Sequence, residues 1–372
     1  ESVGRFISFG EAGGMTDQPE EDHSTRDDIR QRMTDDDRAQ WDVIQEWKAA
    51  QVNPRSPRVI TQRIRSYVLT PVKKVVGLVG KIPGGAAIAG WISSAVLGLV
   101  EKATSAAESS VRRERIVKAH RRAGNDVECL EDIRNLNLAE IQLVRPHLKV
   151  GYAAVTATEG AVSSVFATGG AVAAILGLGI ASAPGIGVIA AAIGLDIATF
   201  LISSARLVSH TAAYYGYDTR EPTEKLFSAM VLSQAIAPRS SADDHAVEKE
   251  TSMRIFNKVV RKLTKRGSME SVGNNALTAS VNSLFAALGA RLVGMKMAQI
   301  LPLIGIIVGM VLNASLIRTI GVTADHLYRE RLLIERYGQD DSAPDHEEAD
   351  DEDDLDTEVA RYIELAKAEK RR

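Results

Sequence analysis

The sequence is poor in cysteine and in aromatic residues, and it contains long stretches without any charge. Cys129 is its only cysteine, so a disulfide within the chain is excluded, which fits a reducing compartment. Its first residues, ESVGRFISFGEAGG, contain no apolar core of the kind that signal peptides carry. We therefore expect a protein that is not secreted.

The common catalytic and cofactor-binding motifs are absent as well. The sequence has no G-x-x-x-x-G-K-[ST], H-E-x-x-H, C-x-x-C or G-x-S-x-G pattern. The pairs Gly177/Gly179 and Gly185/Gly187 lack the strand–turn–helix setting of a nucleotide loop, and we interpret them as packing glycines. The consecutive residues 243–245 (Asp-Asp-His) have poor geometry for metal ligands. We therefore expect no enzymatic activity, no metal and no cofactor.

The charge is spread unevenly along the chain. Residues 1–50 carry a net charge of −7, residues 338–358 carry twelve acids and no base, and residues 51–337 carry +13. A basic body is attracted to anionic lipid, by about 1 kcal/mol per Lys or Arg near the surface. Nucleic acid is a less favoured partner, because the basic residues lack interleaved aromatics and lie beside apolar runs.

The most unusual stretch is Gly160–Leu195, which has no charge and consists mostly of Gly, Ala, Ser and Val. Small side chains let helix backbones approach closely, as is typical of helices packed in lipid. Pro184 allows a helix restart, so we predict a hairpin of helices at about 158–181 and 184–215. Asp196 falls inside the second helix. Three interpretations of Asp196 stay open. It is a functional acid inside the membrane, a residue at a helix end that faces water, or the partner of Arg206 in an ion pair.

Two further uncharged segments, Ile82–Val100 and Met297–Ile317, flank this stretch in the sequence. In all three segments a proline stands just ahead of a glycine. This pattern predicts kinked or re-entrant helices, and the alternative is chance convergence of helices rich in small residues. Met297–Ile317 is the best candidate for a membrane span, with a G-x-x-x-G pattern. The candidate helix-packing or membrane-facing residues are Pro83, Gly84, Pro184, Gly187, Pro302, Gly305 and Gly309.

A basic amphipathic run, Val59–Lys81, precedes the first uncharged segment. Its pattern favours a helix on a membrane surface, and a solvated face on a packed helix is the alternative. The candidate basic membrane-surface residues are Arg63, Arg65, Lys73, Lys74 and Lys81.

Helical spacing of apolar residues accounts for most of the remaining chain. A first helix is predicted from Asp35, capped by Asp35 or Asp36, with Ala39, Val43, Trp47 and Ala50 on its apolar face. Its Trp41 and Trp47 are interpreted either as interfacial anchors or as packed core residues. Further helices are predicted over 101–124, 126–144, 222–237, 247–265, 277–292, 319–337 and 359–372.

These patterns predict an all-α fold, a helical bundle with Gly/Ala-rich, Pro-interrupted hairpins and no sheet. We expect a disordered acidic segment over 1–34, a helical domain over 35–337, an acidic disordered tail over 338–358 and a short, isolated charged helix over 359–372.

Two stretches resemble the signature of the EcsC family. One is Tyr214-Tyr-Gly-Tyr-Asp218 with the helix start and LFSAMVLSQA that follow, and the other is the run from Ile300 to Asn313 with the helix after it. The start of the domain and the Gly-rich segment after Lys81 are similar too, so the resemblance covers roughly 40–337. Its motif residues here include Tyr215, Gly216, Tyr217, Asp218, Asn313 and Arg318.

The resemblance implies a bacterial, helical, membrane-associated protein of a family named for a protein encoded beside an ABC transporter. It assigns no catalytic or binding residues. We expect a non-enzymatic protein that binds anionic membrane, at its cytoplasmic side or inserted in it, with a transporter or another membrane protein as candidate partner. The alternative is a soluble all-α binding module with a small-residue core or an apolar ligand cavity. The oligomeric state stays open.

Overall fold

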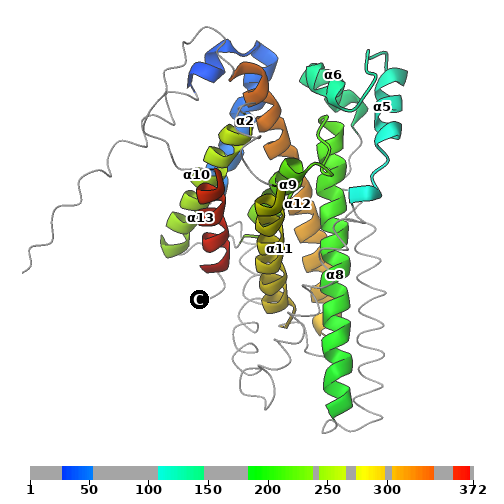
Figure 1. The fold of residues 1–372 in the computed structure, drawn as a ribbon, viewed down its shortest axis with the longest axis vertical. Helices are drawn as coiled ribbons and strands as arrows, with labels where there is room; N and C mark the ends of the chain where they lie inside the picture. The colour runs from blue at the N-terminus through cyan, green and yellow to red at the C-terminus, as the bar shows by residue number, and fades with distance from the viewer. Residues whose placement is uncertain are drawn as a thin grey trace, which may run out of the picture.

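The computed structural model describes residues 27–52, 108–145, 183–237, 243–264, 274–297, 304–338 and 355–368, and all its regular elements are helices. The predicted all-α class is confirmed. The centre is formed by α8 (Ala183–Tyr214), α9 (Pro222–Ile236), α11 (Asn274–Met297) and α12 (Ile304–Tyr337), as Figure 1 shows. Around them lie α2 (Asp35–Val52), α10 (Asp243–Thr264) and α13 (Leu355–Ala368), and, beside the end of α8, α5 (Arg113–Arg122), the 3-10 helix η1 (Glu131–Asn135) and α6 (Leu138–Val144).

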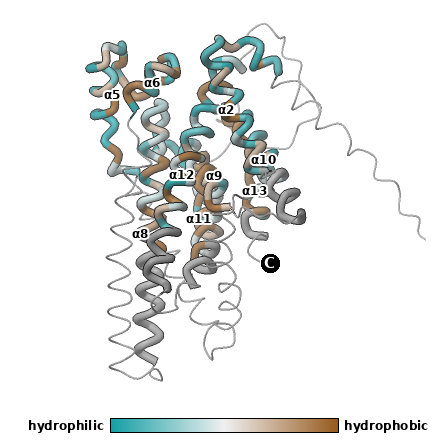
Figure 2. The backbone as a smooth tube through the Cα atoms, turned by 180° about the vertical axis from the view of Figure 1, so that it is seen from behind, coloured by the Kyte–Doolittle hydropathy of each residue, from teal (hydrophilic) through white to brown (hydrophobic). Residues whose placement is uncertain are grey.

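The innermost helix is α9, which packs against α8, α11 and α12. Pro222 stands in its first turn, where a proline costs no hydrogen bond, and nearly every later residue of the helix is buried. A helix that is enclosed on all sides needs apolar or paired residues all round, which is what LFSAMVLSQAI provides. Polar positions in Figure 2 gather on the peripheral helices, most clearly α2 and α5.

Most aromatic residues in the described part of the chain are buried in this core. The ring of Phe227 in α9 meets Tyr328 of α12 edge to face at 4.9 Å and Phe256 of α10 at 5.6 Å. Tyr217 lies 5.6 Å from Tyr328 on the other side. Such ring pairs add about 0.5–1.5 kcal/mol each beyond their buried area, so a low aromatic content still yields one well-defined centre.

Helix α2 begins where predicted but uses a different cap and a different face. Thr34 Oγ1 accepts a hydrogen bond from the Asp37 amide at 3.3 Å, so Thr34 takes the capping place expected of Asp35 or Asp36. The predicted apolar face was wrong, because its Ala39, Val43 and Ala50 are exposed and only Trp47 is half-buried. The buried stripe is Asp37, Trp41, Ile44 and Lys48. Trp41 is therefore a core residue and not an interfacial anchor.

Several predicted boundaries also change. Residues 27–32 are helical and Ile29 is buried, so the disorder expected over 1–34 is wrong for these residues. The single helix predicted over 126–144 is instead η1 and α6, joined by an extended link at Leu136 and Asn137. The C-terminal helix begins at Leu355, inside the predicted acidic tail, and it packs on α10 and α11 and is not isolated.

The predicted second arm of the hairpin is confirmed as α8, and the first arm, at about 158–181, lies outside the described residues. Within the described part of the chain, no helix is long and apolar enough to cross a membrane. Met297–Ile317 is divided between the end of α11 and the start of α12, with 298–303 outside the described residues, and the segment Ile82–Val100 lies outside them as well. The expectation of a span at Met297–Ile317 therefore gains no support.

Candidate functional site

The turn after α8 has a conformation that requires glycine. Gly216 has φ of +85°, its amide donates to Ala213 O at 3.1 Å, and the Tyr217 amide donates to Ala212 O at 3.0 Å. This pair of bonds is the Schellman motif, which ends a helix with a left-handed residue. A Cβ at Gly216 would lie 2.8 Å from Arg134 Cγ, so the close approach of η1 excludes a side chain as well.

This turn directs two buried tyrosines at α12. Tyr215 donates its hydroxyl hydrogen to Asp325 at 2.6 Å, and Tyr217 donates to Glu335 at 2.9 Å. Asp325 also accepts hydrogen bonds from Arg329, one turn later at 2.7 Å, and from Arg145 at the end of α6. Two stretches of sequence more than a hundred residues apart are therefore joined by charge-assisted hydrogen bonds inside the protein.

A second group surrounds Arg331, which is buried in the middle of the same network. Its guanidinium donates to both carboxylate oxygens of Glu224, at 2.8 and 2.5 Å, and to Glu335 at 2.9 Å. It also lies over the rings of Tyr217 at 4.5 Å and Phe227 at 4.7 Å. Arginine suits this place because its planar fork can bind a carboxylate with two bonds while its face stacks on aromatic rings.

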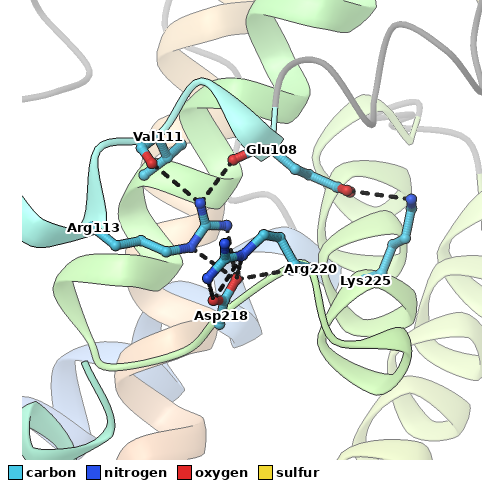
Figure 3. Close-up of polar contacts among 6 residues, drawn as sticks. All are labelled: Glu108, Val111, Arg113, Asp218, Arg220 and Lys225. Carbon is cyan, nitrogen blue, oxygen red and sulfur yellow. Dashed lines mark hydrogen bonds and ion pairs between the residues drawn. The ribbon is translucent and has the colours of Figure 1, made fainter. Parts of the chain in front are cut away.

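A third group, shown in Figure 3, ties the start of α5 to the turn. Arg113 donates to Asp218 at 2.8 Å and to the carbonyl oxygens of Glu108 and Val111 at 3.0 and 3.1 Å. The same carboxylate of Asp218 also pairs with Arg220 at 2.6 Å.

The side chain of Glu108 itself pairs with Lys225 of α9 at 3.2 Å. Glu108 follows the undescribed residues 53–107, so this group holds the point at which that segment enters the described fold.

Helix α2 joins the network from the opposite side of α12. Lys48, buried to 5% exposure, pairs with Glu330 at 2.7 Å and donates to Asn257 of α10 at 2.6 Å. Trp47 stacks on His326 with ring centroids 4.6 Å apart. Arg336 and Tyr337 at the end of α12 bond the buried Asp37, the latter at 2.7 Å.

The electrostatics favour fixed ionisation states. Burial raises the pKa of Asp325, but the positive charges of Arg329 and Arg145 outweigh it and leave the pKa below its ordinary value. Burial opposes the charge of Arg331, yet Glu224, Tyr217 and Glu335 together raise its pKa, so it stays protonated. Burial raises the pKa of Tyr215 and Tyr217, so both hydroxyls remain hydrogen-bond donors.

Two other acids of the network have pKa values above their ordinary value, in contrast to Asp325. Burial raises the pKa of Glu108 and of Glu224, and their cationic partners Lys225 and Arg331 offset this only in part. Within the described residues no group of three or more His, Cys, Asp or Glu side chains could hold a metal ion. What the arrangement does physically is to bind α2, α9, the end of α6 and the turn after α8 to one helix, α12, and to bind α5 to that turn.

The predicted family-motif residues are largely brought together here. Tyr215, Gly216, Tyr217 and Asp218 form the turn of this site, as the resemblance placed them. Of the two motif residues on α12, Asn313 is buried and Arg318 is exposed, and neither reaches the turn.

The other predicted residues lie away from the network or outside the described chain. Pro184 and Gly187 lie in the first turns of α8, and Gly305 and Gly309 in those of α12. Residues that lie outside the described part of the chain are Pro83, Gly84, Pro302, Arg63, Arg65, Lys73, Lys74 and Lys81.

Sequence reasoning missed the charged partners of the motif. The run 319–337 was predicted as a helix from its apolar spacing, with no partners assigned to its charges, and its Asp325, Arg329, Glu330 and Arg331 are all buried. A signal was present, because Asp325/Arg329 and Arg331/Glu335 are opposite charges four residues apart on different faces of one helix. When a largely apolar helix carries charges on every side, some of these charges are buried, and buried charges need ion-pair partners inside the protein.

These features define an all-α protein in which a tyrosine-containing turn is bound by buried ion pairs to a long central helix. The model of the EcsC protein family matches residues 38–333, most of the chain, so the protein belongs to the EcsC family. That match includes both the turn and the helix that it contacts. No curated protein and no solved structure matches the chain.

Proposed function

We propose that this EcsC-family chain is a non-enzymatic protein that associates peripherally with anionic membranes through one end of its helical bundle. The observation that carries the proposal is the separation of charged and uncharged helix ends along the length of the molecule. The ion-pair network lies toward one end, and the uncharged starts of α8 and α12 point toward the other, with α8 reaching further (Figure 1).

The directions of the two helices follow from their contacts. Tyr215, just after the end of α8, bonds Asp325, which lies about two-thirds of the way along α12, so both helices run toward the network. At 1.5 Å per residue, the 32 residues of α8 span about 48 Å and the 34 residues of α12 about 51 Å. Measured from the Tyr215–Asp325 contact, the start of α8 lies about 48 Å away and the start of α12, 21 residues before Asp325, about 32 Å away, both on the same side of the network.

The sequence at that end favours contact with lipid. Ala183–Leu195 and Ile304–Ile317 contain no charged residue, whereas the ends of the same helices carry the buried ion pairs. A charge-free helix end enters the interfacial region of a bilayer at low cost, and the basic body of the chain adds attraction to anionic headgroups. This supports association with the membrane surface and needs no spanning helix.

The network supports a scaffolding role and not a catalytic one. Its described carboxylates are paired with arginine or lysine, and its tyrosines donate to carboxylates. By fixing α8 against α12, these bonds set the common direction in which the two uncharged starts point away from the network. A transporter or another membrane protein as partner stays a prediction of the family resemblance.

Co-sedimentation with vesicles tests the proposal. We expect binding to vesicles that contain phosphatidylserine, weaker binding to phosphatidylcholine alone, and partial release by salt. Val188→Asp in α8 and Ile306→Asp in α12 should each reduce binding, whereas Leu143→Asp, at an 83% exposed position of α6 at the other end, should not. Circular dichroism checks that each variant keeps its helices.

Two results would reject the proposal. The first is absence of the wild-type chain from every vesicle pellet. If a lipid then co-purifies with the protein, the soluble binding module is favoured. Equal binding of all three aspartate variants would show that the uncharged end is not the contact.

A further inference from the structure

Helix α13 lies outside the family match, yet it packs on helices that lie within it. The match ends at residue 333, and α13 begins at Leu355. Its contacts are with α10 and α11, at one side of the bundle (Figure 1). The surface that α13 covers therefore belongs to the family domain. The helix itself comes from the sequence after that domain.

The contact is formed by one apolar face of α13. Val359, Tyr362 and Ile363 are buried, at the spacing of a helix face, whereas Thr357, Ala360 and Arg361 are exposed. The Tyr362 hydroxyl donates to the carbonyl oxygen of Met230 in α9 at 3.3 Å, and its ring lies 6.5 Å from that of Phe256 in α10. Tyr362 thus contacts both α9 and α10, and we call the surface of α9, α10 and α11 that α13 covers the groove.

One ion pair fixes the orientation of the helix in this groove. Glu358, with 2% exposure, lies 3.0 Å from Lys258 of α10 and 3.0 Å from Arg361, one turn later in α13. A carboxylate so deeply buried needs its cationic partner, because an unpaired buried charge is strongly unfavourable. Lys258 therefore selects helices that carry an acid just before their apolar face.

The connection between domain and helix allows exchange. Sixteen residues separate Gly338 from Leu355, and ten of them are acidic with no lysine or arginine. A chain of sixteen residues reaches at most about 55 Å, so the length of the connection alone does not hold α13 at one place. Covalent connection raises the local concentration of α13 at the groove without making the contact permanent.

We propose that the groove between α9, α10 and α11 is a docking site for an amphipathic helix of a partner protein, and that α13 occupies it until such a helix displaces it. The partner helix carries an acid followed by an aliphatic residue, and an aromatic–aliphatic pair one turn later, as in Glu358-Val359-x-x-Tyr362-Ile363. This is the helix-in-groove mode of recognition, with specificity from the buried salt bridge. The inference goes beyond membrane association and does not depend on it.

The test uses a fluorescent synthetic peptide of residues 355–368 and full-length variants of the chain. Tyr362→Glu places a charge on the floor of the groove and should release α13, whereas Ala360→Glu makes the same change on the exposed face and serves as the matched control. We expect Tyr362→Glu to bind the peptide at least about tenfold more tightly than the wild type or the control, because its groove is empty. Adding Lys258→Glu should abolish this gain, and a Glu358→Lys peptide should restore it.

Equal peptide affinity of the wild type and a folded Tyr362→Glu variant would overturn the proposal. If that variant loses its helices, hydrogen exchange on the unmodified chain decides instead. Faster exchange of α13 amides than of α9 and α11 amides supports displacement, and equal protection refutes it. A concentration-dependent dimer that the peptide dissociates would identify α13 of a second copy as the occupant and overturn the assignment to a partner protein.

Discussion

The buried ion pair of Arg331 and Glu224 gives the sharpest prediction about the network. Arg331→Met keeps most of the length of the side chain but removes its charge, leaving Glu224 and Glu335 inside the protein without their shared cation. Breaking one partner of a buried pair costs about 3–5 kcal/mol, because the remaining charge stays desolvated. We expect a loss of this size here, since both partners are less than a tenth exposed and share two hydrogen bonds.

Unfolding by urea, followed by circular dichroism, measures the effect. Adding Glu224→Gln to Arg331→Met should restore at least about 1 kcal/mol, because it removes the stranded charge. Arg318→Met, at an exposed position of the same helix, should change the unfolding free energy by less than about 0.5 kcal/mol. If Arg331→Met costs no more than Arg318→Met, the network does not hold the helices together.

Three further predictions concern the turn, the pH response and the first helix. Gly216→Ala should lower the unfolding free energy by about 1–3 kcal/mol in the same urea assay, because of its positive φ and the approach of Arg134. Burial, followed by the charge of Arg206, lowers the pKa of His210 from 6.5 to about 4, so stability should be full above pH 6.5 and fall as the pH drops toward 4. In a pH series His210→Gln should remove that part of the loss; an unchanged slope would contradict it. Thr34→Ala should cost about 1 kcal/mol of unfolding free energy through loss of the cap of α2, and no change would exclude that cap.

Local signals in the sequence predicted the helices well where a turn or cap residue marks their ends. The helix predicted to end at about 215 does end there, at a glycine with left-handed φ, Gly216, and the helix predicted from 222 does begin at Pro222. Both effects depend on the backbone preferences of one residue, which are independent of the rest of the chain.

Burial could not be predicted where it depends on distant charges. The stripe Asp37, Trp41, Ile44 and Lys48 looks less apolar than the face chosen for α2, and it is buried only because distant Glu330 and Arg336 complete its charges. Periodicity measures apolar content and carries no information about such pairings.

The same limit applies to the candidate site. The family motif identified the turn at Tyr215–Asp218, but its acceptors and ion-pair partners lie on other helices and follow only from the packing. The docking of α13 was missed for the related reason that a short charged helix appears independent until its apolar face meets a groove.

The central claim is that the uncharged end of the bundle contacts the membrane. Single cysteines at Val188, Ile306 and Leu143, each introduced with Cys129→Ser and labelled with an environment-sensitive fluorophore, test it directly. We predict a blue shift and a rise in emission at 188 and 306 on addition of phosphatidylserine vesicles, and no change at 143. A change at 143 alone, or no change at any of the three positions, would contradict the claim.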